Sequence, residues 1–323
     1  MILNGGDGSK KKQQPVFVVS SGRSGSTLLA KMINRHPQIL CVSDLFEPVG
    51  DIPYFKQELR VNGEDFFKTL SSPSLKQRIK YWRNRPTSEL LFMPEDDNMV
   101  SLLLTYTLPF VTDGKPMDLY LKLEEETRNW EEDSMPNQLL RFFDWLRDQG
   151  EKELWVERTG GSLPHMKQMI ETWPSAKFIY NYRDCRETAI SMMTGSFFRL
   201  YLALTQNPEL DEWDETYMPP LGEMGAMLNQ WVVDAVAALE GVPDHQKWEL
   251  RYEDLLDDTE ATLRSFACFV FDREESTRED YEWAAEQSKV VKRNPLKFPA
   301  LNPDQQAELN EACREGQKAL GYE

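Results

Sequence analysis

The chain has 323 residues, of which 40% are hydrophobic and 11% aromatic, which indicates a globular protein with an ample core and excludes a disordered one. A formal net charge of −17 argues against nucleic acid or an anionic membrane as the main partner. No apolar run reaches the roughly 20 residues of a membrane-spanning helix, so no membrane span is expected. The four cysteines show neither CxxC spacing nor a neighbouring histidine cluster, which favours a cytoplasmic protein with no metal site.

The chain begins with a polar segment and continues into a strand. Residues 1–14 are rich in glycine and lysine and lack the apolar core of a signal peptide, so we expect a flexible tail or linker there. We expect a single domain over residues 15–323. The apolar run Val16–Val19 predicts a buried parallel strand, and the apolar side chains of residues 28–33 recur at helical spacing.

The loop between this strand and helix consists of small and polar residues. The first N–H groups of a helix have no intrahelical partner, and glycine lets the backbone approach a ligand closely, so such a loop binds anions. The loop differs from that of nucleoside triphosphatases, because Gly25 is followed by Ser26 where those proteins have lysine. The candidate ligand-binding residues are Gly22, Arg23, Ser24, Gly25, Ser26 and Thr27.

The five residues Arg-Ser-Gly-Ser-Thr at 23–27 resemble the 5′-phosphosulfate loop of the sulfotransferases, which reads [KR]-S-G-[ST]-T. That family takes sulfuryl groups from 3′-phosphoadenosine 5′-phosphosulfate (PAPS) and releases adenosine 3′,5′-bisphosphate (PAP). The resemblance implies that Arg23 and the loop amides stabilise the charge that grows on the donor during transfer. It also implies that the reaction requires no metal.

Beyond the loop, residues 38–43 predict a second strand, and Asp44 and Glu47 follow its carboxyl end. From 49 to 137 the alternation of strands and helices is lost. We expect a mostly helical insertion there, packed over the site as a substrate lid. This stretch contains an arginine-rich patch at 78–85.

The alternation resumes after the insertion and predicts an α/β fold with a parallel sheet flanked by helices. The expected strands are 154–157, 176–182 and 248–252, and the expected helices are 138–147, 163–172, 186–193, 225–239, 259–271 and 304–320.

Three later segments extend the resemblance to the sulfotransferases. Arg183 stands at the end of a strand and Ser191 lies eight residues later on a helix, which is the spacing of the family's 3′-phosphate site. Tyr252 opens a Tyr-Glu-Asp-Leu segment that lies near the adenine in the family. Lys292 and Arg293 occupy the place of a basic loop over the 3′-phosphate, although the usual Arg-Lys-Gly is absent.

Sulfuryl transfer to a hydroxyl group also needs a general base. Asp44 best matches the distance from the loop at which some branches of the family place a catalytic carboxylate, and Glu47 is the near alternative. Other branches use a histidine, for which His165 is the candidate. It is offset from the usual Lys-Thr-His, whose place is taken by Arg158-Thr159-Gly160.

The function expected from the resemblance is PAPS-dependent transfer to an acceptor alcohol. The flexible start and the large apolar insertion resemble sulfotransferase domains of polyketide assembly lines, which sulfate the β-hydroxyl of a carrier-bound acyl chain before decarboxylative release. In that case the patch at 78–85 would meet an acidic acyl carrier protein. The alternatives are sulfation of a small-molecule or glycan alcohol, a kinase-like phosphotransferase, and a non-catalytic nucleotide-binding module.

Overall fold

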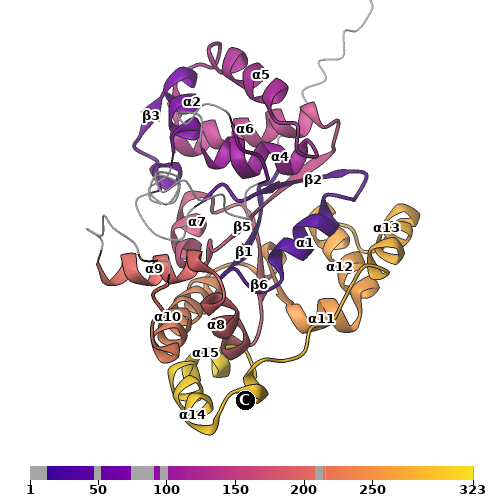
Figure 1. Ribbon diagram of the computed structural model, residues 1–323. Coiled ribbons are helices and arrows are strands. Elements are labelled where there is room, and N and C mark those ends of the chain that lie inside the picture. The colour runs from indigo at the N-terminus through magenta and orange to yellow at the C-terminus, as the bar shows by residue number, and fades with distance from the viewer. Residues whose placement is uncertain are drawn as a thin grey trace, which may run out of the picture.

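A parallel β-sheet forms the centre of the protein (Figure 1). The structure is a computed structural model that describes residues 13–46, 52–73, 91–94, 101–207, 214 and 216–322. Within these residues the main sheet has five strands in the order β2-β5-β1-β6-β7, all parallel. Their bounds are β1 Val16–Ser20, β2 Ile39–Ser43, β5 Leu154–Gly160, β6 Lys177–Tyr182 and β7 Lys247–Arg251.

Helices cover both faces of this sheet, because its strands are apolar on both sides. In β1, Phe17 and Val19 belong to one buried cluster and Val16 and Val18 to the other. The larger cluster is closed by α6 Met135–Gln149, α7 Met166–Thr172, α8 Cys185–Met193 and α10 Leu221–Glu240. The smaller is closed by α1 Ser26–Ile33, α12 Thr259–Phe271 and α13 Arg278–Ser288. The expected α/β fold with helices flanking a parallel sheet is confirmed.

The remaining helices join or extend these layers. α14 and α15 pack on α10, and α11 follows β7 directly. Among the described residues, none of the helices combines the length and the apolar sequence needed to cross a bilayer. The bounds are α9 Ser196–Gln206, α11 Tyr252–Asp257, α14 Pro303–Ala312 and α15 Arg314–Ala319, with short turns η1 Pro53–Phe55, η4 Leu163–His165, η5 Asp244–Gln246 and η6 Phe298–Ala300.

The described part of the stretch at 49–137 is largely helical and packs against the start of α6. Phe66 of α2 lies 6.4 Å from Phe142 of α6 between ring centroids. A short antiparallel ribbon of β3 and β4 was not expected from the sequence. The arginine-rich patch at 78–85 lies outside the described residues. The elements are β3 Arg60–Val61, α2 Gly63–Ser71, the π-helical turn η3 Leu103–Thr107, α4 Leu108–Val111, α5 Met117–Thr127 and β4 Asp133–Ser134.

The structure corrects the sequence analysis at several boundaries. β5 runs three residues beyond 157, because Arg158, Thr159 and Gly160 pair with β1 despite their polarity. Tyr252 begins α11 and does not end β7. The helices α9 and α13 were not predicted. In the expected tail, Gln13 is already bonded to the fold, since its side chain pairs with the backbone of Trp155.

Candidate functional site

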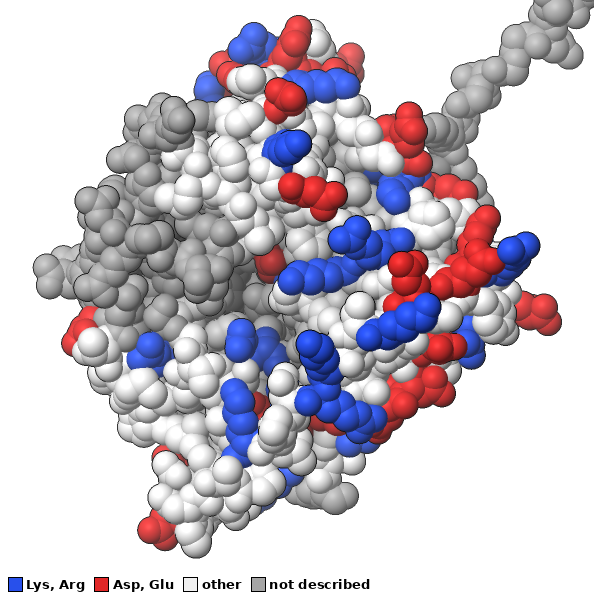
Figure 2. Space-filling view, turned by 45° about the vertical axis from the view of Figure 1, so that its right-hand side comes forward, with Lys and Arg blue, Asp and Glu red and all other residues white. Residues whose placement is uncertain are grey.

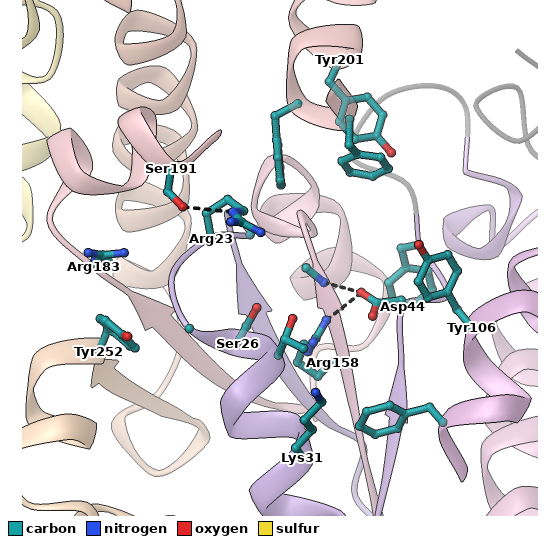
Figure 3. A pocket seen from close by; sticks show the side chains of 18 of the residues that line it. Arg23, Ser26, Lys31, Asp44, Tyr106, Arg158, Arg183, Ser191, Tyr201 and Tyr252 are labelled. Carbon is teal, nitrogen blue, oxygen red and sulfur yellow. Dashed lines mark hydrogen bonds and ion pairs between the residues drawn. The ribbon is translucent and has the colours of Figure 1, made fainter. Parts of the chain in front are cut away.

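A cavity of about 490 Å³ opens at the carboxyl ends of the strands. In parallel α/β sheets this edge is where ligands bind. The last residues of β5 and the segments that follow β1, β2, β6 and β7 contribute lining residues (Figure 3). Although the chain is strongly acidic, Lys and Arg side chains gather beside a hollow on one face of the molecule (Figure 2).

The loop after β1 lies directly against the start of α11. Gly25, the residue before α1, has φ 82°, a conformation that glycine adopts without strain. A Cβ atom at Gly25 would lie 2.2 Å from the Tyr252 ring, so a side chain there would displace that ring. The close approach of loop and ring therefore depends on glycine at this position.

The structure places Arg23 beside Ser191. Arg23 Nε donates to Ser191 Oγ at 3.1 Å, although the two residues are 168 positions apart in the chain. The sequence analysis assigned Arg23 to the phosphosulfate and Ser191 to a separate 3′-phosphate site. Both belong to one cavity, and the guanidinium of Arg23 lies at the end expected for the 3′-phosphate (Figure 3).

Arg183 completes this end of the cavity. Its guanidinium carbon lies 5.0 Å above the centre of the Tyr252 ring, and its Nη2 donates to Glu187 Oε2 at 3.0 Å. The Nε of Arg183 is buried and has no hydrogen-bond partner among the described residues. The structure thus brings together Arg23, Arg183, Ser191 and Tyr252 around one cationic end of the cavity.

Three other predicted ligands are placed elsewhere. The hydroxyl of Ser24 is buried and donates to Asn181 Oδ1 at 3.3 Å, away from the cavity lining. Lys292 is exposed and does not line the cavity. Arg293 pairs with Asp257 and the Leu256 carbonyl oxygen. Asn294 lines the cavity instead.

Of the two candidate bases that the structure describes, Asp44 and His165, Asp44 lines the cavity. Its Oδ1 accepts hydrogen bonds from Arg158 Nη1 at 2.7 Å and from the Gly160 N–H at 3.1 Å. Its Oδ2 accepts from the Ser43 hydroxyl at 2.9 Å. His165 lies outside the cavity lining, 5.6 Å from the Phe55 ring, because the turn η4 directs it toward that ring. Glu47 lies outside the described residues.

Arg158 is a cavity residue that the sequence analysis did not select. Its side chain is only 1% exposed, and beyond the bond to Asp44 its Nε and Nη2 have no hydrogen-bond partner among the described residues. A buried guanidinium with unused donors is costly unless it binds an anion. Its position in Arg158-Thr159-Gly160, the triplet that takes the place of the family's Lys-Thr-His, was a signal in the sequence. Arg158 was not selected because the strand was expected to end at residue 157.

Aromatic side chains form the other end of the cavity. α9 supplies one group, in which the rings of Phe197 and Tyr201 lie 4.3 Å apart. Tyr106 faces them from η3, next to Asp44 (Figure 3). The apolar lining comprises Phe46, Leu91, Leu102, Tyr106, Phe110, Phe197, Phe198 and Tyr201.

A model of the sulfotransferase family matches residues 15–270 of this chain. The chain belongs to the sulfotransferase family. The sulfotransferase domain from the curacin biosynthetic pathway has a similar fold, with a TM-score of 0.53 and 13% identity over 96% of this chain and 98% of that chain. Sulfotransferase STF9 from Mycobacterium avium gives a TM-score of 0.48 and 15% identity over 96% of this chain and 76% of that chain. No curated protein matches.

Membership of the sulfotransferase family implies a PAPS donor, and the cationic end of the cavity fits such a ligand. The unpartnered nitrogens of Arg158 and Arg183 offer donors to phosphate or sulfate oxygens. The described residues contain no group of three or more His, Cys, Asp or Glu side chains able to hold a metal ion. A reaction without metal stays a prediction.

Behind the cavity of this sulfotransferase lies a buried carboxyl group. Burial raises the pKa of Glu157 to about 8, and its Oε2 has no hydrogen-bond partner among the described residues. Its Oε1 accepts from the Thr159 hydroxyl at 2.5 Å. Thr159 Oγ1 in turn accepts from the N–H groups of Leu45 and Phe46. Glu157 thereby supports the turn that presents Asp44.

We expect Glu157→Gln to reduce the loss of stability as pH rises. Because the folded-state pKa lies above that of the unfolded chain, the protonated group stabilises the fold at acid pH, and this contribution is lost as pH rises through about 8. Between pH 5 and 8 the wild type should lose roughly 1 kcal/mol of unfolding free energy per pH unit more than the variant.

Urea unfolding at several pH values measures this difference. Glu171→Gln, which changes an exposed carboxyl group on α7, is the control and should follow the wild type. Parallel pH profiles of Glu157→Gln and the wild type would contradict the raised pKa.

Proposed function

We propose that this sulfotransferase transfers a sulfuryl group from PAPS to a hydroxyl group on a largely apolar acceptor. The observation that carries the proposal is one cavity with a cationic end and an aromatic end, with the Asp44–Arg158 ion pair beside both. A nucleotide donor fits the cationic end, and an apolar acceptor fits the aromatic end. The hydroxyl of the acceptor would then meet Asp44.

The proposed donor contacts follow from the geometry of the cationic end. Arg183, Arg23 and Ser191 hold the 3′-phosphate, and Tyr252 contacts the adenine. The N–H groups at the start of α1 and the nitrogens of Arg158 bind the 5′-phosphosulfate. PAPS supplies the sulfuryl group. Donors at the bridging and phosphate oxygens favour the transition state because negative charge grows there.

Asp44 is proposed as the general base. Its Oδ1 is held by Arg158 and the Gly160 N–H, which fixes the direction of the carboxylate. Oδ2 then accepts the proton that the acceptor hydroxyl loses as its oxygen bonds to sulfur. The bond from sulfur to the 5′-phosphate oxygen breaks, and PAP leaves with the bonding electrons. Glu47 remains the alternative base.

The acceptor is proposed to be an apolar chain with a hydroxyl group. Aromatic rings bind such chains through buried apolar area, and Arg23 and Arg183 lie at the opposite end of the cavity, while Lys31 lines it from α1 (Figure 3). The β-hydroxyl of a carrier-protein-bound acyl chain meets this requirement, and we propose it as the natural acceptor. A glycan, whose surface consists mostly of hydroxyl groups, offers these rings less apolar area than an acyl chain does.

The proposal is tested by incubating the enzyme with PAPS and four acceptors, and reading the gain of one SO₃ by mass spectrometry. The acceptors are a β-hydroxyacyl carrier protein, the matching free hydroxy ester, a phenol and a neutral glycan. We expect the carrier-bound chain to react fastest and the glycan not to react. Transfer to the glycan alone would refute the apolar acceptor, and phosphorylation with ATP and Mg²⁺ would refute sulfuryl transfer.

A further inference from the structure

Glu187 connects two parts of the donor site that are far apart in the sequence. It lies in the first turn of α8 and is only 2% exposed. Its Oε2 accepts from Arg183 Nη2 at 3.0 Å. Its Oε1 accepts from the N–H groups of Lys297 and Phe298, at 2.7 and 2.8 Å. Both oxygens are therefore used, each toward a different segment.

The second of these segments passes the cavity. We call residues 289–298 the strap, because they run from the end of α13 to the first residue of η6 and Asn294 within them lines the cavity. Residues 292–296 are exposed, so the strap has little core of its own. Its far end is held by Glu187 and by the Arg186 guanidinium, which lies 4.5 Å above the centre of the Phe298 ring.

The environment of Glu187 argues against an incidental ion pair. Burying a carboxylate costs several kcal/mol unless hydrogen bonds compensate it, and here three donors do so. One of these donors is Arg183, whose Nε still has no partner among the described residues. Glu187 thus uses one edge of the guanidinium and leaves another edge for an anion in the cavity.

We propose that Glu187 is a positioning residue that fixes Arg183 and the end of the strap relative to each other, so that Arg183 meets the 3′-phosphate of the donor and Asn294 of the strap stays in the cavity lining. The proposal rests on the proposed function, since it assumes that PAPS occupies the cationic end. A preorganised guanidinium binds phosphate more tightly than one that must first be ordered. Glu187 itself does not touch the nucleotide.

Glu187→Gln separates the two contacts. The amide oxygen of glutamine still accepts from the two strap N–H groups, but its NH₂ group faces Arg183 Nη2, so one donor meets another. We expect PAP affinity to fall about ten-fold, while affinity for adenosine 5′-phosphate changes less than two-fold. Isothermal titration calorimetry measures both, and the KM for PAPS should rise more than kcat falls.

Two further variants complete the experiment. Phe298→Ala loosens the strap but keeps the Glu187–Arg183 pair. PAP should therefore dissociate faster than from the wild type. The preference for PAP over adenosine 5′-phosphate should fall less than in Glu187→Gln. Glu282→Gln removes an exposed ion pair with Arg278 on α13 and should behave as the wild type.

The outcomes are distinguishable. If the wild type fails to prefer PAP over adenosine 5′-phosphate, the proposed function is wrong. If the wild type shows this preference and Glu187→Gln retains it in full, the positioning role alone is wrong. If both nucleotides weaken by the same factor and the melting temperature falls, Glu187 supports the fold without positioning Arg183.

Discussion

Replacing Asp44 with asparagine is expected to slow sulfuryl transfer by about 10²–10⁴-fold, the usual contribution of a general base. Asparagine keeps an oxygen that can accept from the Gly160 N–H and from Arg158, so the turn should retain its shape. It cannot accept the proton of the acceptor. The measurement is kcat with saturating PAPS and the best acceptor of the screen.

Donor binding separates this effect from a structural one. Asp44→Asn leaves the charge of Arg158 uncompensated, so PAP should bind at least as tightly as to the wild type. Asp65→Asn, an exposed aspartate on α2, is the control. Unchanged turnover in Asp44→Asn would remove Asp44 as the base and turn attention to Glu47. His165→Ala should be without effect on turnover, because its ring is outside the cavity lining.

Arg183→Ala is expected to reduce PAP affinity by about 100-fold and to leave adenosine 5′-phosphate within about three-fold. Each charge-assisted hydrogen bond contributes roughly 1.5–3 kcal/mol, and a bidentate contact with the 3′-phosphate supplies up to two of them. Adenosine 5′-phosphate lacks the 3′-phosphate, so its affinity should not depend on the contact between Arg183 and that group. Calorimetric titration with PAP and with adenosine 5′-phosphate gives the ratio of the two affinities directly.

Arg128→Ala, which removes an exposed arginine paired with Glu124, is the matched control and should change neither affinity. An equal loss of both nucleotides in Arg183→Ala would show that Arg183 acts through Tyr252 and the adenine, against which its guanidinium lies. In that case the 3′-phosphate would have to be held by Arg23 and Ser191.

The pairing of Asp44 with Arg158 makes the two residues one unit. Without Asp44 the cavity would hold a buried uncompensated cation, and without Arg158 the carboxylate would lose the donor that orients it. In the proposed reaction, the ion pair places the proton acceptor Asp44 next to the Arg158 nitrogens that would bind the sulfuryl oxygens.

The sequence by itself determined the fold class and most of the local elements, although not α9, α13 or the β3–β4 ribbon. The continuous apolar run of β1, the glycine before α1 and the 3.6-residue spacing of apolar side chains in the helices are local patterns, so they can be recognised without tertiary contacts. Arg183 and Ser191 were selected through their resemblance to the family's 3′-phosphate site, whose spacing can be recognised because a strand end and the following helix lie close in the chain.

The tertiary structure alone decided which charged side chains meet. The register that pairs Ser43 of β2 with Arg158 of β5 brings Asp44 and Arg158 together across 114 positions, and no local pattern encodes it. The packing of α8 against the loop after β1 likewise sets the contact of Arg23 with Ser191. A one-residue change of strand register would move every side chain of that strand to the opposite face of the sheet. Sequence periodicity does not specify this long-range pairing, and the pairing determined which residues line the cavity.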